Sequence, residues 1–196
     1  MKQIVVPGDK LEGKVDSYVF TDAGNTYSMV LGVFDKGDGV GKLDPLTGKY
    51  FPQVDDFVVG VISEIKKGGY VVDINSPYDA FLMSRRIYDE KDIILARVNN
   101  VSEVRSVSLT YDKKLFDGEI MEVSPVKVPR VIGKKNSMVD MIKEKTKAEI
   151  VVGQNGRIWL KGGDISKARE AIDKIEKEAH TDGLTERINE FLNKVI

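Results

Sequence analysis

A basic loop between residues 129 and 136 holds side chains that are well suited to binding an anionic polymer. Lysine and arginine bind phosphate oxygens, and glycine lets a phosphate backbone approach the peptide chain closely because it has no side chain. Residues 127–161 contain 9 Lys and Arg against 3 Asp and Glu, although the whole chain has a net charge of −1. Positive charge is therefore concentrated here, as expected for a nucleic-acid site. The candidate contacts of the loop are Arg130, Gly133, Lys134, Lys135 and Asn136.

The segments around this loop have the order of a KH domain. A short helix is expected to end at the loop, and Ser137 is suited to cap a second helix that buries Met138 and Ile142. Two short β-runs then flank the sequence Gly-Gln-Asn-Gly at 153–156. KH domains clamp RNA on a loop of the form Gly-x-x-Gly. Asn136 stands at the usual place of the second glycine; it tolerates a left-handed backbone but adds a side chain.

The Gly-Gln-Asn-Gly turn is interpreted as structural. An Asn-Gly pair between two strands suits a tight hairpin because both residues accept positive φ. We therefore predict that Gly153, Asn155 and Gly156 shape a turn or pack one domain on another, without contacting RNA. Trp159 is expected to be buried in the same region rather than to stack on a base.

Residues 54–122 are expected to form a five-stranded β-barrel. Short runs rich in Val and Ile are separated by turn signals such as Lys-Lys-Gly-Gly at 66–69. Short strands with glycine at tight bends suit an OB-fold, whose second and third strands bind oligonucleotides. The expected strands are 57–62, 70–74, 80–82, 93–98 and 104–109, the last two joined around Asn99 and Asn100.

Basic side chains supply the candidate RNA contacts of this barrel. Arg85 and Arg86 follow the third strand, where the RNA face of an OB-fold is expected, and form the strongest pair. Tyr70 is the one aromatic residue near the second strand, so base stacking is expected to contribute little. The candidates in the barrel are Lys66, Lys67, Tyr70, Arg85, Arg86, Arg97 and Arg105.

The chain as a whole is expected to be multidomain, mainly β with an α+β part. Residues 1–53 are rich in Gly and Asp, lack helical periodicity and predict a small N-terminal β domain of hairpins, with a turn at 36–42. Residues 54–122 supply the OB-fold barrel, and residues 123–196 supply a type I KH domain with C-terminal helices.

The composition argues against an enzyme. The chain has no cysteine and one histidine, which removes disulfides and Cys-based zinc sites. Residues 37–42 are glycine-rich and end in lysine, but Leu43 stands where a P-loop needs Ser or Thr. We therefore expect no catalytic residue, metal or cofactor. No apolar run approaches the roughly 20 residues of a transmembrane helix, so a cytoplasmic protein without a membrane partner is expected.

With these domains in this order, the whole chain resembles the RNA-binding cap subunit of the archaeal-type exosome, in the ribosomal-RNA-processing protein four family. The resemblance rests on the small β domain, an S1-type OB barrel entered through Tyr-Phe-Pro at 50–52, and a KH domain with Gly-x-Asn-Gly at 153–156. It implies a non-catalytic subunit that captures single-stranded RNA and guides its 3′ end into a hexameric phosphorolytic ring, for degradation or processing. It also implies that three cap subunits dock on this ring through their N-terminal domains.

A free-standing single-stranded RNA-binding protein in translation or transcription fits the same domain order. Stoichiometric co-purification with a phosphorolytic ring would separate the two functions.

Overall fold

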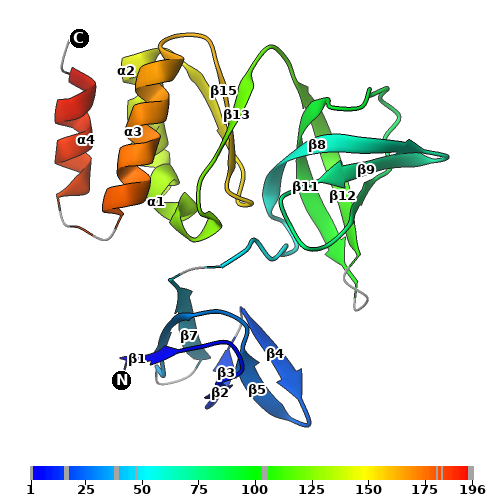
Figure 1. Ribbon diagram of the computed structural model, residues 1–196, viewed down its shortest axis with the longest axis vertical. Helices are drawn as coiled ribbons and strands as arrows, with labels where there is room; N and C mark the ends of the chain where they lie inside the picture. The colour runs from blue at the N-terminus through cyan, green and yellow to red at the C-terminus, as the bar shows by residue number, and fades with distance from the viewer. Residues whose placement is uncertain are drawn as a thin grey trace. The chain divides into compact units, whose positions relative to one another are not determined.

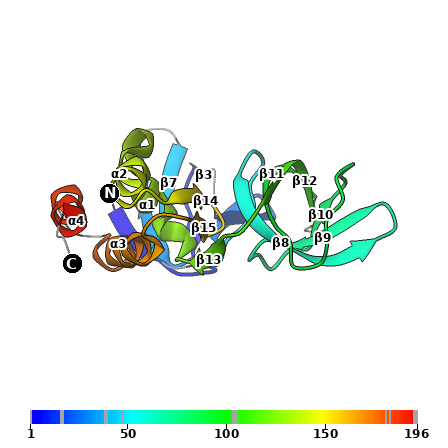
Figure 2. The same cartoon turned by 90° about the horizontal axis from the view of Figure 1, so that it is seen from above.

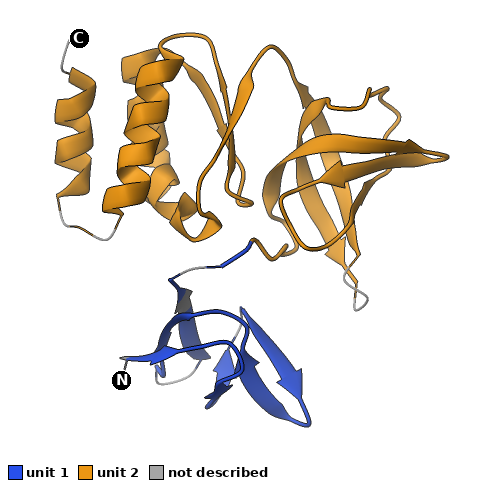
Figure 3. Cartoon of the chain, viewed as in Figure 1, with its two compact units in different colours: residues 1–49 blue, residues 50–196 orange. Residues whose placement is uncertain are grey.

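The computed structural model describes residues 2–15, 18–37, 40–46, 48–102, 106–179, 181 and 183–193. The chain forms two compact units, residues 1–49 and residues 50–196 (Figure 3). Arg105, one of the predicted RNA contacts, lies outside the described residues. No helix in the described ranges is both long and apolar enough to cross a membrane.

The first unit is built from strands, in two sheets with the orders β1-β6-β7-β3 and β2-β5-β4. It is not made of hairpins alone, because β3 runs parallel to β7. The turn expected at 36–42 does not extend to residue 42: β7 begins at Val40, and its Leu43 is buried opposite Phe34 of β6. The strands are β1 (Lys2–Val5), β2 (Lys10–Leu11), β3 (Lys14–Val15), β4 (Val19–Asp22), β5 (Asn25–Ser28), β6 (Gly32–Asp35) and β7 (Val40–Pro45).

The second unit begins with a closed five-stranded barrel of order β10-β12-β11-β8-β9, as the sequence predicts (Figure 1; Figure 2). The turn expected at Asn99 and Asn100 is wrong. Strand β11 continues to Val101 and Asn100 pairs with Ser108, because irregularities in the register keep β11 and β12 paired past these residues. The strands are β8 (Phe57–Lys66), β9 (Gly69–Asp73), β10 (Ala80–Leu82), β11 (Ile93–Val101) and β12 (Val107–Leu115).

A KH domain follows the barrel in the same unit. Its three-stranded antiparallel sheet has the order β13-β15-β14. The chain order is strand, two helices, two strands, helix, which is that of a type I KH domain. The elements are β13 (Glu119–Glu122), η1 (Pro125–Lys127), α1 (Val128–Ile132), η2 (Lys134–Asn136), α2 (Ser137–Thr146), β14 (Glu149–Val152), β15 (Arg157–Lys161), α3 (Ile165–Glu178) and α4 (Leu184–Asn193).

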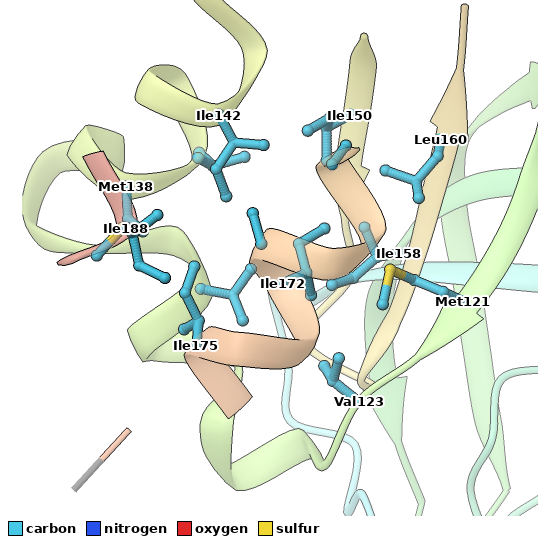
Figure 4. Packing of buried hydrophobic residues seen from close by; sticks show 14 of the residues in the cluster. Met121, Val123, Met138, Ile142, Ile150, Ile158, Leu160, Ile172, Ile175 and Ile188 are labelled. Atoms are coloured by element: carbon cyan, nitrogen blue, oxygen red, sulfur yellow. The ribbon is translucent and has the colours of Figure 1, made fainter. Parts of the chain in front are cut away.

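Helices α2 and α3 cover one face of the KH sheet and bury its apolar side chains (Figure 4). Met121, Ile158 and Leu160 alternate with residues of the opposite face and pack under Ile142 and Ile172. Asp164 precedes helix α3 as its N-cap, and its side chain accepts a hydrogen bond from the Lys167 amide at 2.9 Å. A cap of this kind satisfies one of the free amides of the first turn. The cap expected at Ser137 is wrong: Ser137 is the first residue of α2, and the left-handed Asn136 precedes it without a capping side-chain bond.

The other face of the KH sheet packs on the barrel wall. Trp159 and Val59 are buried together with Leu115, and Ile120 and Val151 contact the same cluster. The KH sheet is thus covered on both faces, by its own helices and by the barrel (Figure 1). Trp159 is inside this contact and only 2% exposed, which removes it as a stacking surface for a base.

Candidate nucleic-acid interface

One end of the barrel brings together four of the predicted cations. The register aligns Ile65 of β8 with Tyr70 of β9, and Tyr70 with Leu82 of β10. The β8–β9 turn therefore lies beside the segment that leaves β10. The exposed residues Lys66, Lys67, Arg85 and Arg86 are carried by these two segments and are here named the basic barrel end.

Two members of the basic barrel end are paired and two are available. Lys66 lies 3.3 Å from Glu64, and the Nε atom of Arg86 lies 3.8 Å from Asp112. Lys67 and Arg85 have no ion pair with any residue that the structure describes. An exposed cation without a carboxylate partner can bind a phosphate without first breaking an existing contact.

A hydrogen-bond network holds the segment that carries the two arginines. The Ser84 hydroxyl donates to Asp112 at 2.8 Å, and the Tyr88 hydroxyl donates to the same carboxylate. Burial raises the pKa of Asp112, but these hydrogen bonds outweigh it and hold the pKa below its usual value. The carboxylate thus stays charged at neutral pH and keeps accepting both bonds. The arginines are presented by an ordered loop rather than a loose one.

Tyr70 supports this loop from below. Its hydroxyl donates to the Arg86 carbonyl at 3.0 Å and accepts from the Tyr88 amide at 3.3 Å. Its ring meets the Tyr88 ring edge to face, with the centroids 5.3 Å apart, and packs on the barrel core. Tyr70 therefore orients the basic segment, and its ring is partly buried against the barrel core.

Arg97 does not lie at the basic barrel end. It pairs with Phe57 at the start of β8, whereas Lys66 ends the same strand. One of its terminal nitrogens lies 3.5 Å from an Asp55 carboxylate oxygen. The barrel cations thus fall into two groups at opposite ends of β8.

The KH loop presents its lysines to solvent. Lys134, Lys135 and Asn136 are exposed, and the last two have left-handed backbones with φ of 52° and 65°. Gly133 is needed for packing as well, because a Cβ there would lie 2.7 Å from the Met138 amide nitrogen and Cβ. Asn136 adopts the conformation that a glycine would supply, at the cost of a side chain beside the loop.

The Gly-Gln-Asn-Gly turn is buried against the barrel. The Asn155 amide nitrogen donates to the carbonyls of Val59 at 2.8 Å and Ile74 at 2.9 Å, and its oxygen accepts from the Val59 amide at 3.2 Å. Asn155 is fully buried. A Cβ at Gly153 would lie 2.7 Å from the Val59 amide nitrogen, so only glycine lets the two backbones come this close. These residues join the KH domain to the barrel.

Arg157 adds an ionic contact to this junction. Its guanidinium donates to the carbonyl and carboxylate of Asp73 at 2.7 and 2.8 Å, and to Glu122 at 2.9 Å. Burial works against ionisation of Asp73, but the hydrogen bonds from Arg157 and from the Asn75 amide prevail and lower its pKa. Asp73 belongs to β9 and Glu122 to β13, so one arginine ties the barrel to two parts of the KH sheet.

Exposed apolar side chains near these cations were not singled out by the sequence. Phe57 and Tyr111 meet edge to face on the barrel surface, with ring centroids 5.8 Å apart. Met83 and Ile87 flank the arginine pair and are 76% and 88% exposed. The alternation of β12 points Tyr111 inward, and only the irregular register turns it out, so periodicity alone could not find it. In the described ranges, no three metal-binding side chains come together.

Comparison with known proteins extends over both units. The KH domain family matches residues 118–166. The exosome complex component Rrp4 of Methanothermus fervidus is 37% identical, covering 100% of this chain and 97% of its own length. That of Pyrococcus furiosus is 41% identical, covering 97% of this chain and 83% of its own length. A crystal structure assigned to an exosome complex RNA-binding protein matches with a TM-score of 0.67 at 37% identity, over 74% of this chain and 95% of that one.

Proposed function

We propose that this chain, which belongs to the Rrp4 family of exosome complex components, is an RNA-binding accessory subunit of the exosome and not its nuclease. Similarity over 97% and 83% of the length of these two relatives favours this role over that of a free-standing RNA-binding protein in translation or transcription.

The basic barrel end is the observation that best supports RNA capture. It gathers four cations on an ordered surface, and two of them have no ion pair within the described chain. Phosphate binding by such side chains is independent of sequence, and it weakens steeply with salt because counterions are released. A subunit that must accept many RNAs needs contacts of this kind. The strand thus captured would be guided, 3′ end first, into a hexameric phosphorolytic ring by cap subunits, three to a complex.

The KH domain in this proposal is mainly a fixed spacer. Asn155 and Arg157 hold it to the barrel through five hydrogen bonds to Val59, Ile74 and Asp73. Its loop has lost the second glycine that allows close approach of a sugar-phosphate backbone. Lys134 and Lys135 then act as an auxiliary positive surface, and Arg130 belongs to the same helix–loop segment.

RNA capture can be tested by reversing the two unpaired cations. Lys67→Glu with Arg85→Glu breaks no ion pair between described residues, so it changes charge with little effect on folding. We expect at least tenfold weaker binding of a labelled single-stranded oligomer in fluorescence anisotropy. The slope of log K against log salt is negative, and its magnitude should decrease by about 0.7 for each lost phosphate contact.

A matched variant controls for net charge. Lys145→Glu with Lys177→Glu makes the same change on exposed positions of helices α2 and α3. It should reduce affinity by less than threefold. Equal losses in the two double variants would mean that only overall charge matters, and the basic barrel end would lose its assigned role.

Docking on the ring is assigned to the N-terminal domain, predicted as residues 1–53. Residues 1–49 form a separate compact unit and carry none of the candidate RNA contacts. A chain that starts at Tyr50 should keep its RNA affinity but should no longer co-purify with ring subunits in stoichiometric amount. Continued association of the shortened chain would move docking to the barrel or the KH domain.

A further inference from the structure

Part of the outer barrel wall is left uncovered by the KH domain. On this wall Val59 and Leu115 pack against the KH sheet. Further along the same strands lie Phe57, Arg97 and Tyr111, on β8, β11 and β12. Directly opposite residues of an antiparallel pair point to the same face, so Phe57 and Arg97, which are register partners, both point outward. These three residues are here named the aromatic platform.

A β-bulge turns Tyr111 onto this platform. Leu95 pairs with Lys113 and Arg97 pairs with Thr110, so Tyr111 and Asp112 together oppose Ala96. Tyr111 has a φ of 51°, which is strained for a bulky residue, and its side chain is 64% exposed. Bulges re-aim side chains, and strain of this kind collects at functional sites. The ring is thereby brought edge to face with the 37% exposed Phe57.

Arg97 and Lys113 make the platform positive. The Nε atom of Arg97 is buried and has no hydrogen-bond partner among the described residues. Its ion pair with Asp55 is long, at 3.5 Å, and that carboxylate is 74% exposed, so the pair contributes little. Lys113 is exposed and lies opposite Leu95, whose side chain points outward to the KH domain. Rings beside cations suit a ligand with both π-faces and negative charge.

We propose that the aromatic platform is a second contact site for single-stranded RNA, where a base stacks on Tyr111 and Phe57 and a phosphate binds Arg97. The proposal rests on the RNA-binding function above and supplies the stacking that the basic barrel end lacks. Base–aromatic stacking accepts any base and is the usual partner of backbone cations in single-strand binding. Because the two sites lie at opposite ends of β8, one strand that reaches both gains avidity.

The test separates stacking from charge. Full-length protein is titrated with a labelled single-stranded oligoadenylate of about 15 nucleotides, long enough to span β8 at about 3.4 Å per nucleotide. Tyr111→Leu keeps an apolar side chain but removes the ring, and it should weaken binding about fivefold or more. Tyr111→Phe keeps the ring and should stay within twofold of the wild type. An abasic oligomer of equal charge should bind the wild type and Tyr111→Leu alike.

A matched control comes from Phe116, which is 58% exposed and has the Lys114 ammonium 5.4 Å from the centroid of its ring. Phe116→Leu should leave affinity unchanged. Should Tyr111→Leu fail to fold, Phe57→Leu carries the same prediction with a smaller loss. Unchanged affinity in folded Tyr111→Leu, or an equal loss for the abasic oligomer, overturns the platform while binding through Lys67 and Arg85 still stands. Loss of ring association without loss of RNA affinity would also overturn it, by marking a protein contact.

Discussion

The two Asn-containing turns of the KH domain are close in composition and opposite in environment. The loop at 133–136 joins two helices, and its Lys135 and Asn136 are exposed in left-handed conformations. The turn at 153–156 joins two strands, and its Asn155 is fully buried with three side-chain hydrogen bonds to the barrel. The first asparagine replaces a glycine for its backbone, whereas the second is needed for its side chain. Identical residue types therefore serve conformation in one turn and domain attachment in the other.

The same substitution at both asparagines should give the largest contrast. Asn155→Asp keeps the size and one acceptor oxygen but loses both donated bonds, to Val59 and Ile74, and buries a charge. We expect a loss of about 3–5 kcal/mol in the free energy of unfolding, measured with denaturant. Asn136→Asp, at an exposed position, should change it by less than about 1 kcal/mol. Similar losses at both positions would erase the distinction between the turns.

Arg157→Gln should give the next largest effect and a pH signature. It removes the ion pair with the half-exposed Asp73, so we expect a loss of about 2 kcal/mol at neutral pH, discounted for solvent screening. Folding lowers the pKa of Asp73. The contribution of its carboxylate to folding stability is therefore present above the unfolded-state pKa of about 3.9, and it is lost as the pH falls through the folded-state pKa. The difference in free energy of unfolding between wild type and variant should decrease from pH 7 to about pH 3. A constant gap would contradict the ionic part of the argument.

Charge reversal in the exposed loop should have a smaller effect. Lys134→Glu with Lys135→Glu alters two exposed side chains, so the free energy of unfolding should change by less than about 0.5 kcal/mol. Since the KH domain is proposed as a spacer, RNA affinity by anisotropy should fall less than threefold. A loss as large as that of Lys67→Glu with Arg85→Glu would show that the loop grips RNA, and the spacer role would have to be abandoned.

Asn136→Gly should have the smallest effect on stability, and it tests whether the KH loop contacts RNA. Glycine adopts the φ of 65° without strain, so thermal unfolding should shift by no more than a few degrees. If the Asn136 side chain obstructs a phosphate backbone, RNA affinity will rise measurably. An unchanged affinity is expected for a spacer.

Local patterns in the sequence were enough to predict the barrel and the order of the KH elements, because strand alternation, glycine turns and helical periodicity are encoded within short windows. The contact between Asn155 and Val59 is different, since the two residues are 96 positions apart. The exposure of Tyr111 also could not be predicted from the sequence, because a bulge turns its side chain away from the face that strand alternation indicates. Arg97 was grouped with Arg85 on charge alone, and only the register separated them to two ends of the barrel.

The double cover of the KH sheet also sets an order of events during synthesis. The barrel strands end at Leu115, but the Trp159 side chain that seals the barrel wall is made 44 residues later. At a synthesis rate of about 5–20 residues per second, the nascent barrel exposes Val59 and Leu115 to solvent for about 2–9 seconds. During that interval this protein is most accessible to a chaperone. A chain that stops before Trp159 would keep the apolar barrel wall exposed permanently.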